Sequence, residues 1–152
     1  MVISLDMHSA SDNLQYSSIL NSLNKLNFNS NNTENLKDIL TNREVVLQTA
    51  QDPVSWPQQK GCVQNSCIGP IFWNLVANEI LSEEWPSSIH LQAFADDFVL
   101  VVAESTGEKF KSTAQEALSI FKRWTDKHHL QISSENSCKI LISKLVNGPT
   151  IK

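Results

Sequence analysis

Three aspartates in this sequence lie where short apolar segments end. Asp6 follows the mostly apolar residues 2–5, and the adjacent pair Asp96 and Asp97 interrupts the apolar run over residues 93–102. Because burying an unpaired charge is costly, such a pair must lie at a solvated turn, be protonated or bind a cation. A tight turn is the simpler interpretation, since aspartate is common in turns.

The third carboxylate, Asp6, favours a metal site over a simple turn. Two strand ends that carry aspartates could lie side by side in one sheet, and three converging carboxylates suit hard divalent cations, above all Mg²⁺. Two such ions roughly 4 Å apart are the usual device for in-line phosphoryl transfer. One ion activates the attacking hydroxyl, and the other steadies the triphosphate and the leaving group. The residues alone therefore predict a metal-dependent phosphoryl-transfer site.

The elements that would position these carboxylates can be predicted from the hydrophobic periodicity. The pattern predicts a strand over residues 2–5, helices over 14–26 and from Thr33, a hairpin from 43–49 and 52–62, and a buried helix over 68–81. It then predicts strands over 89–95 and 98–103, an amphipathic helix over 110–124, and strands over 130–133 and 139–145 with a loop between them. This order indicates an α+β fold, with an antiparallel sheet and helices packed on one face.

The composition is that of one globular domain. The chain has 152 residues, of which 41% are hydrophobic and 18% charged, so it can bury a single core. Its net charge of −4 is unusual for a free-standing nucleic-acid-binding protein, which normally carries a basic face. No apolar stretch approaches the roughly 20 residues needed to cross a bilayer, and we see no targeting signal. We therefore expect a nuclear or cytoplasmic protein with reduced cysteines and no membrane partner.

Four segments resemble the motifs of reverse transcriptases and occur in the expected order. Residues 5–12 (LDMHSASD) are similar to the first catalytic motif, Asp-x-x-x-Ala-Phe-Asp, and residues 60–70 (KGCVQNSCIGP) to the Gly-x-Pro-Gln-Gly-Ser motif. Residues 94–97 (FADD) resemble the Tyr/Phe-Ala-Asp-Asp box, and residues 130–137 (LQISSENS) the Leu-x-Leu-x-x-x-Lys-Thr/Ser motif. From about Leu5 to its end, the chain therefore resembles the reverse transcriptase (RNA-directed DNA polymerase) domain of an arthropod non-LTR, LINE-like retrotransposon of the jockey-like or type-1 group.

This resemblance implies a polymerase palm that makes DNA from dNTPs on an RNA template with two Mg²⁺ ions, or with Mn²⁺. Asp6 and Asp96 would be the principal metal ligands, with Asp97 as the third catalytic carboxylate. The side that faces nucleotide and template would be formed by Met7, His8, Ser11, Gln64, Asn65, Ser66 and Asn136. Residues 1–152 would be a single partial domain, without the fingers upstream or the thumb downstream. The intact protein would bind RNA template and DNA primer, and this fragment would bind nucleic acid weakly.

Four positions depart from the family's pattern. Ser11 stands where the family keeps a bulky aromatic that excludes a ribose 2′-hydroxyl, and Val63 replaces a proline. Asn65 replaces a glycine, and Asn136 replaces the lysine that lies near the triphosphate. Together these changes predict a copy that is impaired or inactive alone.

Two alternatives remain open at this point. The chain could be a non-catalytic palm-like remnant that packs against a partner and binds no metal. It could also be a metal-dependent phosphohydrolase that shares only the carboxylate chemistry, although this leaves residues 64–66 unexplained.

Overall fold

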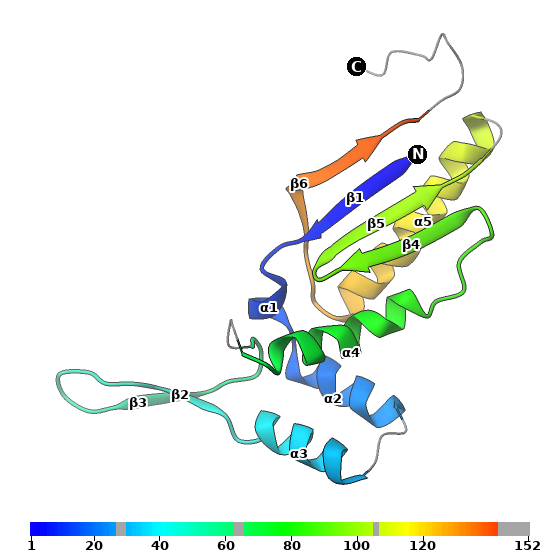
Figure 1. Cartoon of the computed structure of the whole chain (residues 1–152). Coiled ribbons are helices and arrows are strands. Elements are labelled where there is room, and N and C mark those ends of the chain that lie inside the picture. The colour runs from blue at the N-terminus through cyan, green and yellow to red at the C-terminus, as the bar shows by residue number, and fades with distance from the viewer. Residues whose placement is uncertain (27–29, 63–65, 105–106, 143–152) are drawn as a thin grey trace.

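The computed structural model describes residues 1–26, 30–62, 66–104 and 107–142, with helices and strands mixed along the chain (Figure 1). The elements are β1 (Val2–Met7), α1 (Ala10–Asn13), α2 (Tyr16–Lys25), α3 (Ser30–Leu40), β2 (Glu44–Leu47), β3 (Val54–Pro57), α4 (Gly69–Leu81), β4 (Ile89–Phe94), β5 (Asp97–Val102), α5 (Gly107–Lys127) and β6 (Ile132–Ile140). The hairpin, the buried helix and the long amphipathic helix all form at the expected places in the sequence.

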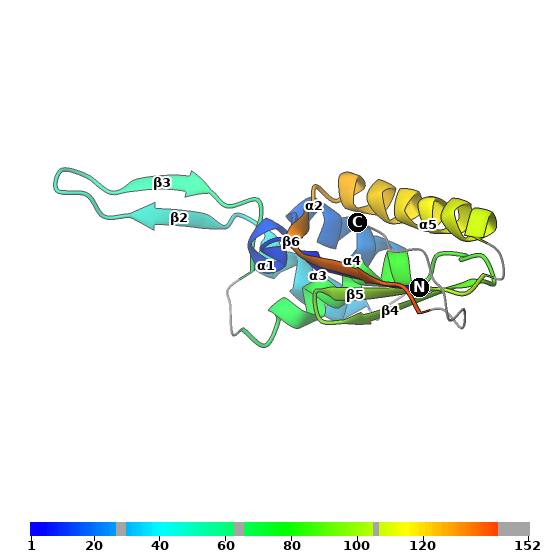
Figure 2. The ribbon, with the colours of Figure 1, turned by 90° about the horizontal axis from the view of Figure 1, so that it is seen from above.

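A four-stranded antiparallel sheet in the order β4-β5-β1-β6 forms one end of the molecule. Side chains alternate between its two faces. Leu5 and Phe98 are therefore buried, while their neighbours Asp6 and Asp97 lie on the other face. The long helix α5 covers the apolar face (Figures 1 and 2). The expected fold class, an antiparallel sheet with helices packed on one face, is confirmed.

An aromatic cluster joins this sheet to the helices. The ring of Phe98 on β5 lies 5.0 Å from that of Phe121 and 5.5 Å from that of Trp124, both on α5. Trp73 of α4 makes edge contacts with Phe98 and Trp124 at 6.3 and 6.4 Å. Such edge-to-face geometry is the favoured one for aromatic pairs. The cluster therefore fixes α4 and α5 against the strand that begins with Asp97.

The β2–β3 hairpin is a separate two-stranded sheet that projects away from the body (Figures 1 and 2). All residues of its two strands are exposed, including Val45, Val46 and Trp56, which are 50%, 56% and 50% exposed. Isolated hairpins are marginally stable in water. This arm is therefore the part of the described chain with the least support from the core.

The last part of the chain differs from the expectation. The sequence predicts a loop between two strands here, but β6 runs without a break from Ile132 to Ile140. Pairing with β1 explains the difference, because β6 matches Asp6 to Ser133 and Ser4 to Cys138. Residues 134–137 therefore lie opposite Leu5 alone and form a bulge in the pairing. The short helix α1 was also not expected, and residues 143–145 of the predicted final strand lie outside the described residues.

Candidate metal and nucleotide site

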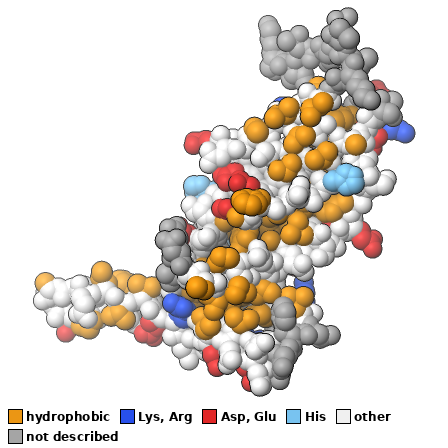
Figure 3. Space-filling view, in the orientation of Figure 1, with side chains coloured by type: hydrophobic (Ala, Val, Ile, Leu, Met, Phe, Trp, Pro, Cys, Tyr) orange, Lys and Arg blue, Asp and Glu red, His pale blue; other side chains and the backbone are white. Residues whose placement is uncertain are grey.

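Asp6 and Asp97 lie directly opposite each other on neighbouring strands. The register of β1 and β5 pairs their Cα atoms, and both residues lie on the face away from the core. Directly opposite residues of an antiparallel pair have Cβ atoms about 5 Å apart, and like charges at such positions destabilise the pair. The space-filling view of this face shows acidic side chains gathered beside hydrophobic ones (Figure 3). A bound cation would offset the repulsion between the two carboxylates.

Asp96 belongs to the turn that joins β4 to β5. The register pairs Phe94 with Asp97, which leaves Ala95 and Asp96 as a two-residue hairpin loop. Ala95 has a φ of 54°, in the left-handed region that is uncommon for residues other than glycine. Asp96 is half-buried. The turn therefore places a third carboxylate next to the facing pair Asp6 and Asp97.

The chemistry of this donor set fits Mg²⁺ or Mn²⁺, because both ions prefer carboxylate oxygens. Among the residues that the structure describes, no three His, Cys, Asp or Glu side chains converge as a ligand group. The backbone brings the three predicted carboxylates to adjoining positions. Their side chains, however, do not converge on one point.

Residues of the β6 bulge hold Asp6 from the other side. Asn136 Nδ2 donates a 3.0 Å hydrogen bond to Asp6 Oδ2. The backbone N–H of Asp6 donates to Ser137 Oγ at 3.2 Å, and this hydroxyl donates to the carbonyl oxygen of Ser133 at 2.5 Å. Asn136 was predicted from the sequence as a nucleotide-side residue, and the structure places it against the carboxylate of Asp6. The contacts of Ser133 and Ser137 could not be predicted, because they depend on the register of the bulge.

The residues after β1 lie beside the start of the second motif. The Cys62 N–H donates to the carbonyl oxygen of Ser11 at 2.9 Å, and the Gly61 N–H donates to that of Leu14 at 2.9 Å. Gly61 has a φ of 87°, and a Cβ built on it would lie 3.2 Å from the carbonyl oxygen of Asp12. A glycine is therefore needed at this crossing.

The remaining predicted residues have different environments. Met7 is 2% exposed and belongs to the core, whereas His8 and Ser11 are exposed. The hydroxyl of Ser66 accepts a 3.0 Å hydrogen bond from the N–H of Gly69, in the first turn of α4. Gln64 and Asn65, together with Val63, lie outside the described residues. The structure thus brings Ser11 and Cys62 together, while Ser66 supports the start of a helix.

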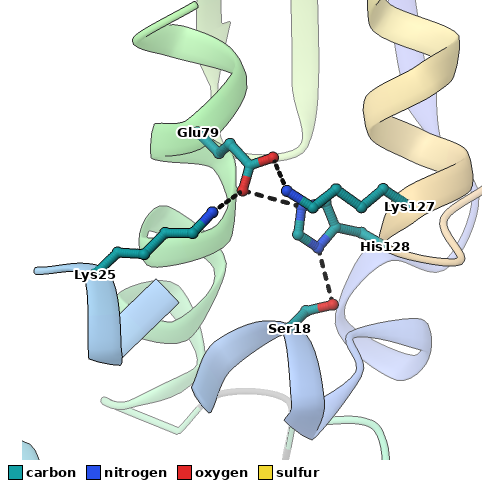
Figure 4. Close-up of polar contacts among 5 residues, drawn as sticks. All are labelled: Ser18, Lys25, Glu79, Lys127 and His128. Carbon is teal, nitrogen blue, oxygen red and sulfur yellow. Dashed lines mark hydrogen bonds and ion pairs between the residues drawn. The ribbon is translucent and has the colours of Figure 1, made fainter. Parts of the chain in front are cut away.

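A second polar cluster, which we call the Glu79 cluster, joins three helices away from the carboxylates (Figure 4). Glu79 of α4 accepts hydrogen bonds from Lys127 of α5 and from Lys25 of α2, the latter at 3.2 Å. His128, just after α5, is 3% exposed, and its Nδ1 lies 2.8 Å from Ser18 Oγ of α2. Its Nε2 lies 3.6 Å from Glu79 Oε2, an ion-pair distance when the ring is protonated. These contacts fasten the C-terminal end of α5 to α2 and α4.

Burial and charge act in opposite directions within the Glu79 cluster. Burial lowers the pKa of His128 below its ordinary value, although the nearby charge of Glu79 opposes the shift. Burial acts to raise the pKa of Glu79, but the hydrogen bonds from Lys127 and Lys25 together hold it below its ordinary value. A neutral imidazole beside an ionised carboxylate is therefore the favoured state at neutral pH.

The fold is shared with polymerases that contain a palm. The structure is similar to apo telomerase from Candida tropicalis truncated from its C-terminal domain, with a TM-score of 0.66 and 15% identity over 91% of this chain and 30% of that one. It also resembles telomerase from Candida albicans in complex with a fragment of telomeric RNA, with a TM-score of 0.52 and 13% identity over 99% of this chain and 29% of that one. At these identities the likeness shows the fold alone.

The family follows from the sequence itself. Residues 1–145 match the model of the family described as Reverse transcriptase (RNA-dependent DNA polymerase). The chain therefore belongs to the reverse transcriptase family, as the four motifs predict.

Curated relatives identify the kind of reverse transcriptase. The chain is 34% identical, over 89 residues, to a retrovirus-related Pol polyprotein from type-1 retrotransposable element R1 2 of Nasonia vitripennis. It is 24% identical, over 149 residues, to a putative 115 kDa protein in type-1 retrotransposable element R1DM of Drosophila melanogaster. These matches cover 58% and 97% of this chain but only 22% and 14% of the relatives. The resemblance to an arthropod non-LTR retrotransposon is confirmed, and the chain spans less than a quarter of these relatives' length.

Among the helices of the described ranges, none is both long enough and apolar enough to span a bilayer.

Proposed function

We propose that this chain is the palm of an RNA-directed DNA polymerase that, in a longer polypeptide, adds dNTPs to a DNA primer on an RNA template. The observation that carries the proposal is the pairing of Asp6 with Asp97, next to Asp96 in the adjoining turn. Asp6 and Asp96 would be the principal ligands of two Mg²⁺ or Mn²⁺ ions, and Asp97 the third carboxylate. Such ions supply charge stabilisation and an activated attacking hydroxyl.

The nucleotide side of this site would lie at the end of β1. The exposed residues His8 and Ser11 follow Asp6 there. The carbonyl oxygen of Ser11 accepts a hydrogen bond from the N–H of Cys62, which precedes Gln64 and Asn65 in the sequence. Backbone near Met7 and His8 would face the triphosphate. The telomerase with a similar fold that is described in complex with RNA supports nucleic acid as the partner of this fold.

Two features favour an impaired copy. Ser11 is too small to block a ribose 2′-hydroxyl, and the amide of Asn136 carries no charge that could neutralise a leaving pyrophosphate. The net charge of −4 also predicts weak binding to nucleic acid at physiological salt. Primer extension by the 152-residue chain at a rate near that of an intact enzyme, and abolished in Asp96→Ala, would contradict this part of the proposal.

Metal binding tests the site itself. Mn²⁺ titration followed by electron paramagnetic resonance should show binding by the unaltered chain and strongly reduced binding by Asp6→Asn and Asp96→Asn. Asp52→Asn removes the same charge from the exposed loop of the hairpin and should bind Mn²⁺ as the unaltered chain does. Equal binding by all four proteins would refute a metal site at these carboxylates.

The second candidate is a non-catalytic palm-like remnant that packs against a partner. The exposed apolar strands of the β2–β3 hairpin favour it, since such surfaces commonly mark contact sites. This candidate predicts that Mn²⁺ binding does not depend on Asp6 or Asp96, so the same titration separates the two functions.

A further inference from the structure

The turn that carries Asp96 is held by an indole group from a different part of the chain. Trp73 Nε1, on α4, donates a 2.7 Å hydrogen bond to the carbonyl oxygen of Ala95. Ala95 directly precedes Asp96 in the two-residue loop between β4 and β5. The hydrogen bond therefore connects the helix that follows the second motif to the loop of the third.

The conformation of Ala95 explains why this loop needs an external contact. Its φ of 54° brings the Cβ atom close to backbone atoms, so the left-handed region is unfavourable for alanine. Such conformations persist where surrounding contacts hold them. The bond from Trp73 is a contact of this kind, because it fixes the carbonyl group of the strained residue itself.

The donor side chain is itself packed in the core. Trp73 is 7% exposed, and its ring contacts the rings of Phe98 and Trp124 edge-on. Phe98 directly follows Asp97, so the same tryptophan supports both ends of the Asp96–Asp97 pair. One end is supported through the N–H group and the other through ring packing.

We infer that Trp73 is a positioning residue, whose indole N–H keeps Ala95 in the left-handed conformation and so sets the backbone from which Asp96 and Asp97 face Asp6. This inference rests on the proposed metal site. It assigns to Trp73 a role beyond packing in the core.

The variant Trp73→Phe tests the inference, because it keeps an aromatic ring and removes the N–H donor. Trp85→Phe is the matched control. Trp85 Nε1 also donates to a backbone carbonyl, that of Ile80 at 3.2 Å, but this bond lies at the end of α4 and not at the carboxylates. Both variants lose an indole-to-carbonyl hydrogen bond, and only one of these bonds holds the turn.

Two measurements distinguish positioning from packing. In the metal-free 152-residue chain, Trp73→Phe should speed amide hydrogen exchange at Asp96 and Asp97, and Trp85→Phe should not. In a Mn²⁺ titration, Trp73→Phe should weaken binding by about 10- to 100-fold, as expected when a group that orients metal ligands is lost. Trp85→Phe should stay within about twofold of the unaltered chain, as expected for a change that touches no metal ligand.

A second substitution separates the lost hydrogen bond from the smaller ring. Glycine adopts a positive φ without strain, so adding Ala95→Gly to Trp73→Phe should recover most of the lost Mn²⁺ affinity. A loss caused by a cavity beside Phe98 would not be recovered in this way.

Two other outcomes of the Mn²⁺ titration would contradict the inference, and they differ in what they say about the proposed function. If Trp73→Phe binds Mn²⁺ as tightly as the unaltered chain while Asp96→Asn does not bind, the inference is wrong and the proposed function stands. If the unaltered chain shows no binding that depends on Asp96, the proposed function fails, and the inference fails with it.

The unaltered chain gives a further test that does not require Trp73→Phe to fold. Coupling between two sites is reciprocal, so saturating Mg²⁺ should slow the exchange of the Trp73 indole proton more than that of Trp85. Equal effects on the two protons would overturn the inference.

Discussion

The side-chain amide of Asn136 donates a 3.0 Å hydrogen bond to Oδ2 of Asp6, across the bulge between β6 and β1. In the pattern that this chain resembles, the position of Asn136 carries a lysine. An amide has no positive charge, so it can hold one carboxylate oxygen without neutralising the group. A carboxylate accepts about four hydrogen bonds or ligands, so this one bond leaves Asp6 with capacity to bind a cation. The hydrogen bond suits a residue that orients Asp6, while its place near the triphosphate stays a prediction.

Replacing Asn136 with alanine should weaken Mn²⁺ binding by about tenfold, the lower end of the range for groups that orient metal ligands. The low end applies because Asn136 is exposed. Mn²⁺ titration of the purified chain measures the change. Asn35→Ala, an exposed asparagine on α3, is the control and should have no effect. Unchanged affinity in Asn136→Ala would show that the hydrogen bond does not orient Asp6.

Gly61→Ala should lower the free energy of unfolding by about 1–3 kcal/mol, because alanine is strained at a positive φ. Its Cβ would also meet the carbonyl oxygen of Asp12 at 3.2 Å. Gly107 has no atom within 4 Å of a built Cβ, so Gly107→Ala at the start of α5 should be neutral or stabilising by up to about 1 kcal/mol. Urea denaturation of both variants measures these changes, and equal effects would contradict the close crossing at Gly61.

Acidification should destabilise the fold through the Glu79 cluster. Because burial lowers the pKa of His128 below its ordinary 6.5, the unfolded chain takes up a proton at a pH where the folded chain does not. The free energy of unfolding should therefore fall as the pH decreases from about 7.5 to about 5.5. The lowered pKa of Glu79 adds a loss in the same direction, but only as the pH falls below its ordinary 4.5.

His128→Gln removes the titrating ring, so its free energy of unfolding should fall less over the same pH interval. Around His128 lie Ser18 and Lys25 on α2, Glu79 on α4, and Trp124 and Lys127 on α5. His90→Gln, on the exposed face of β4, is the matched substitution for comparison. Urea denaturation at about pH 7.5 and about pH 5.5 measures the difference. An identical pH dependence of the unfolding free energy with and without His128 would rule out its contribution.

The β2–β3 hairpin should promote self-association of the isolated chain. Val45 and Trp56 lie opposite each other in its register, and each is 50% exposed. Replacing both with threonine keeps the strand preference and removes apolar surface. Light scattering should then show less concentration-dependent association, with little change in the thermal midpoint of the body. Ile71→Thr, at an exposed position on α4, should leave the association unchanged; an equal decrease would argue against the hairpin as its source.

Much of the fold can be predicted from the sequence because its main elements have strong periodic patterns. The apolar positions of α4 and α5 and the strands on both sides of Asp96 are of this kind. The neighbouring positions of the Asp6 and Asp97 strand ends are also predicted and confirmed, whereas the roles of these carboxylates stay predictions. The prediction for β6 was partly wrong, because the residues expected to form a loop, 134–137, lie in a bulge between two segments that both pair with β1.

Contacts between distant segments could not be predicted from the sequence. Nothing near Trp73 indicates that its N–H reaches Ala95, 22 positions away. No pattern in the sequence indicates that the ring of His128 is buried against Ser18, 110 positions away. Both contacts depend on how α4 and α5 are placed, and periodicity gives only which face of a helix is apolar.

The position of β1 in the sheet has a consequence for the order of folding. β1 begins at Val2, yet both of its neighbours, β5 and β6, lie between residues 97 and 140. During synthesis this apolar strand stays without sheet partners until residues 97–102 have been made, while the β4–β5 hairpin can close locally. Loop-closure entropy makes such distant pairing slow. The strand that carries Asp6 therefore joins the sheet late, and the three carboxylates come together only after β5 (Asp97–Val102) has been made.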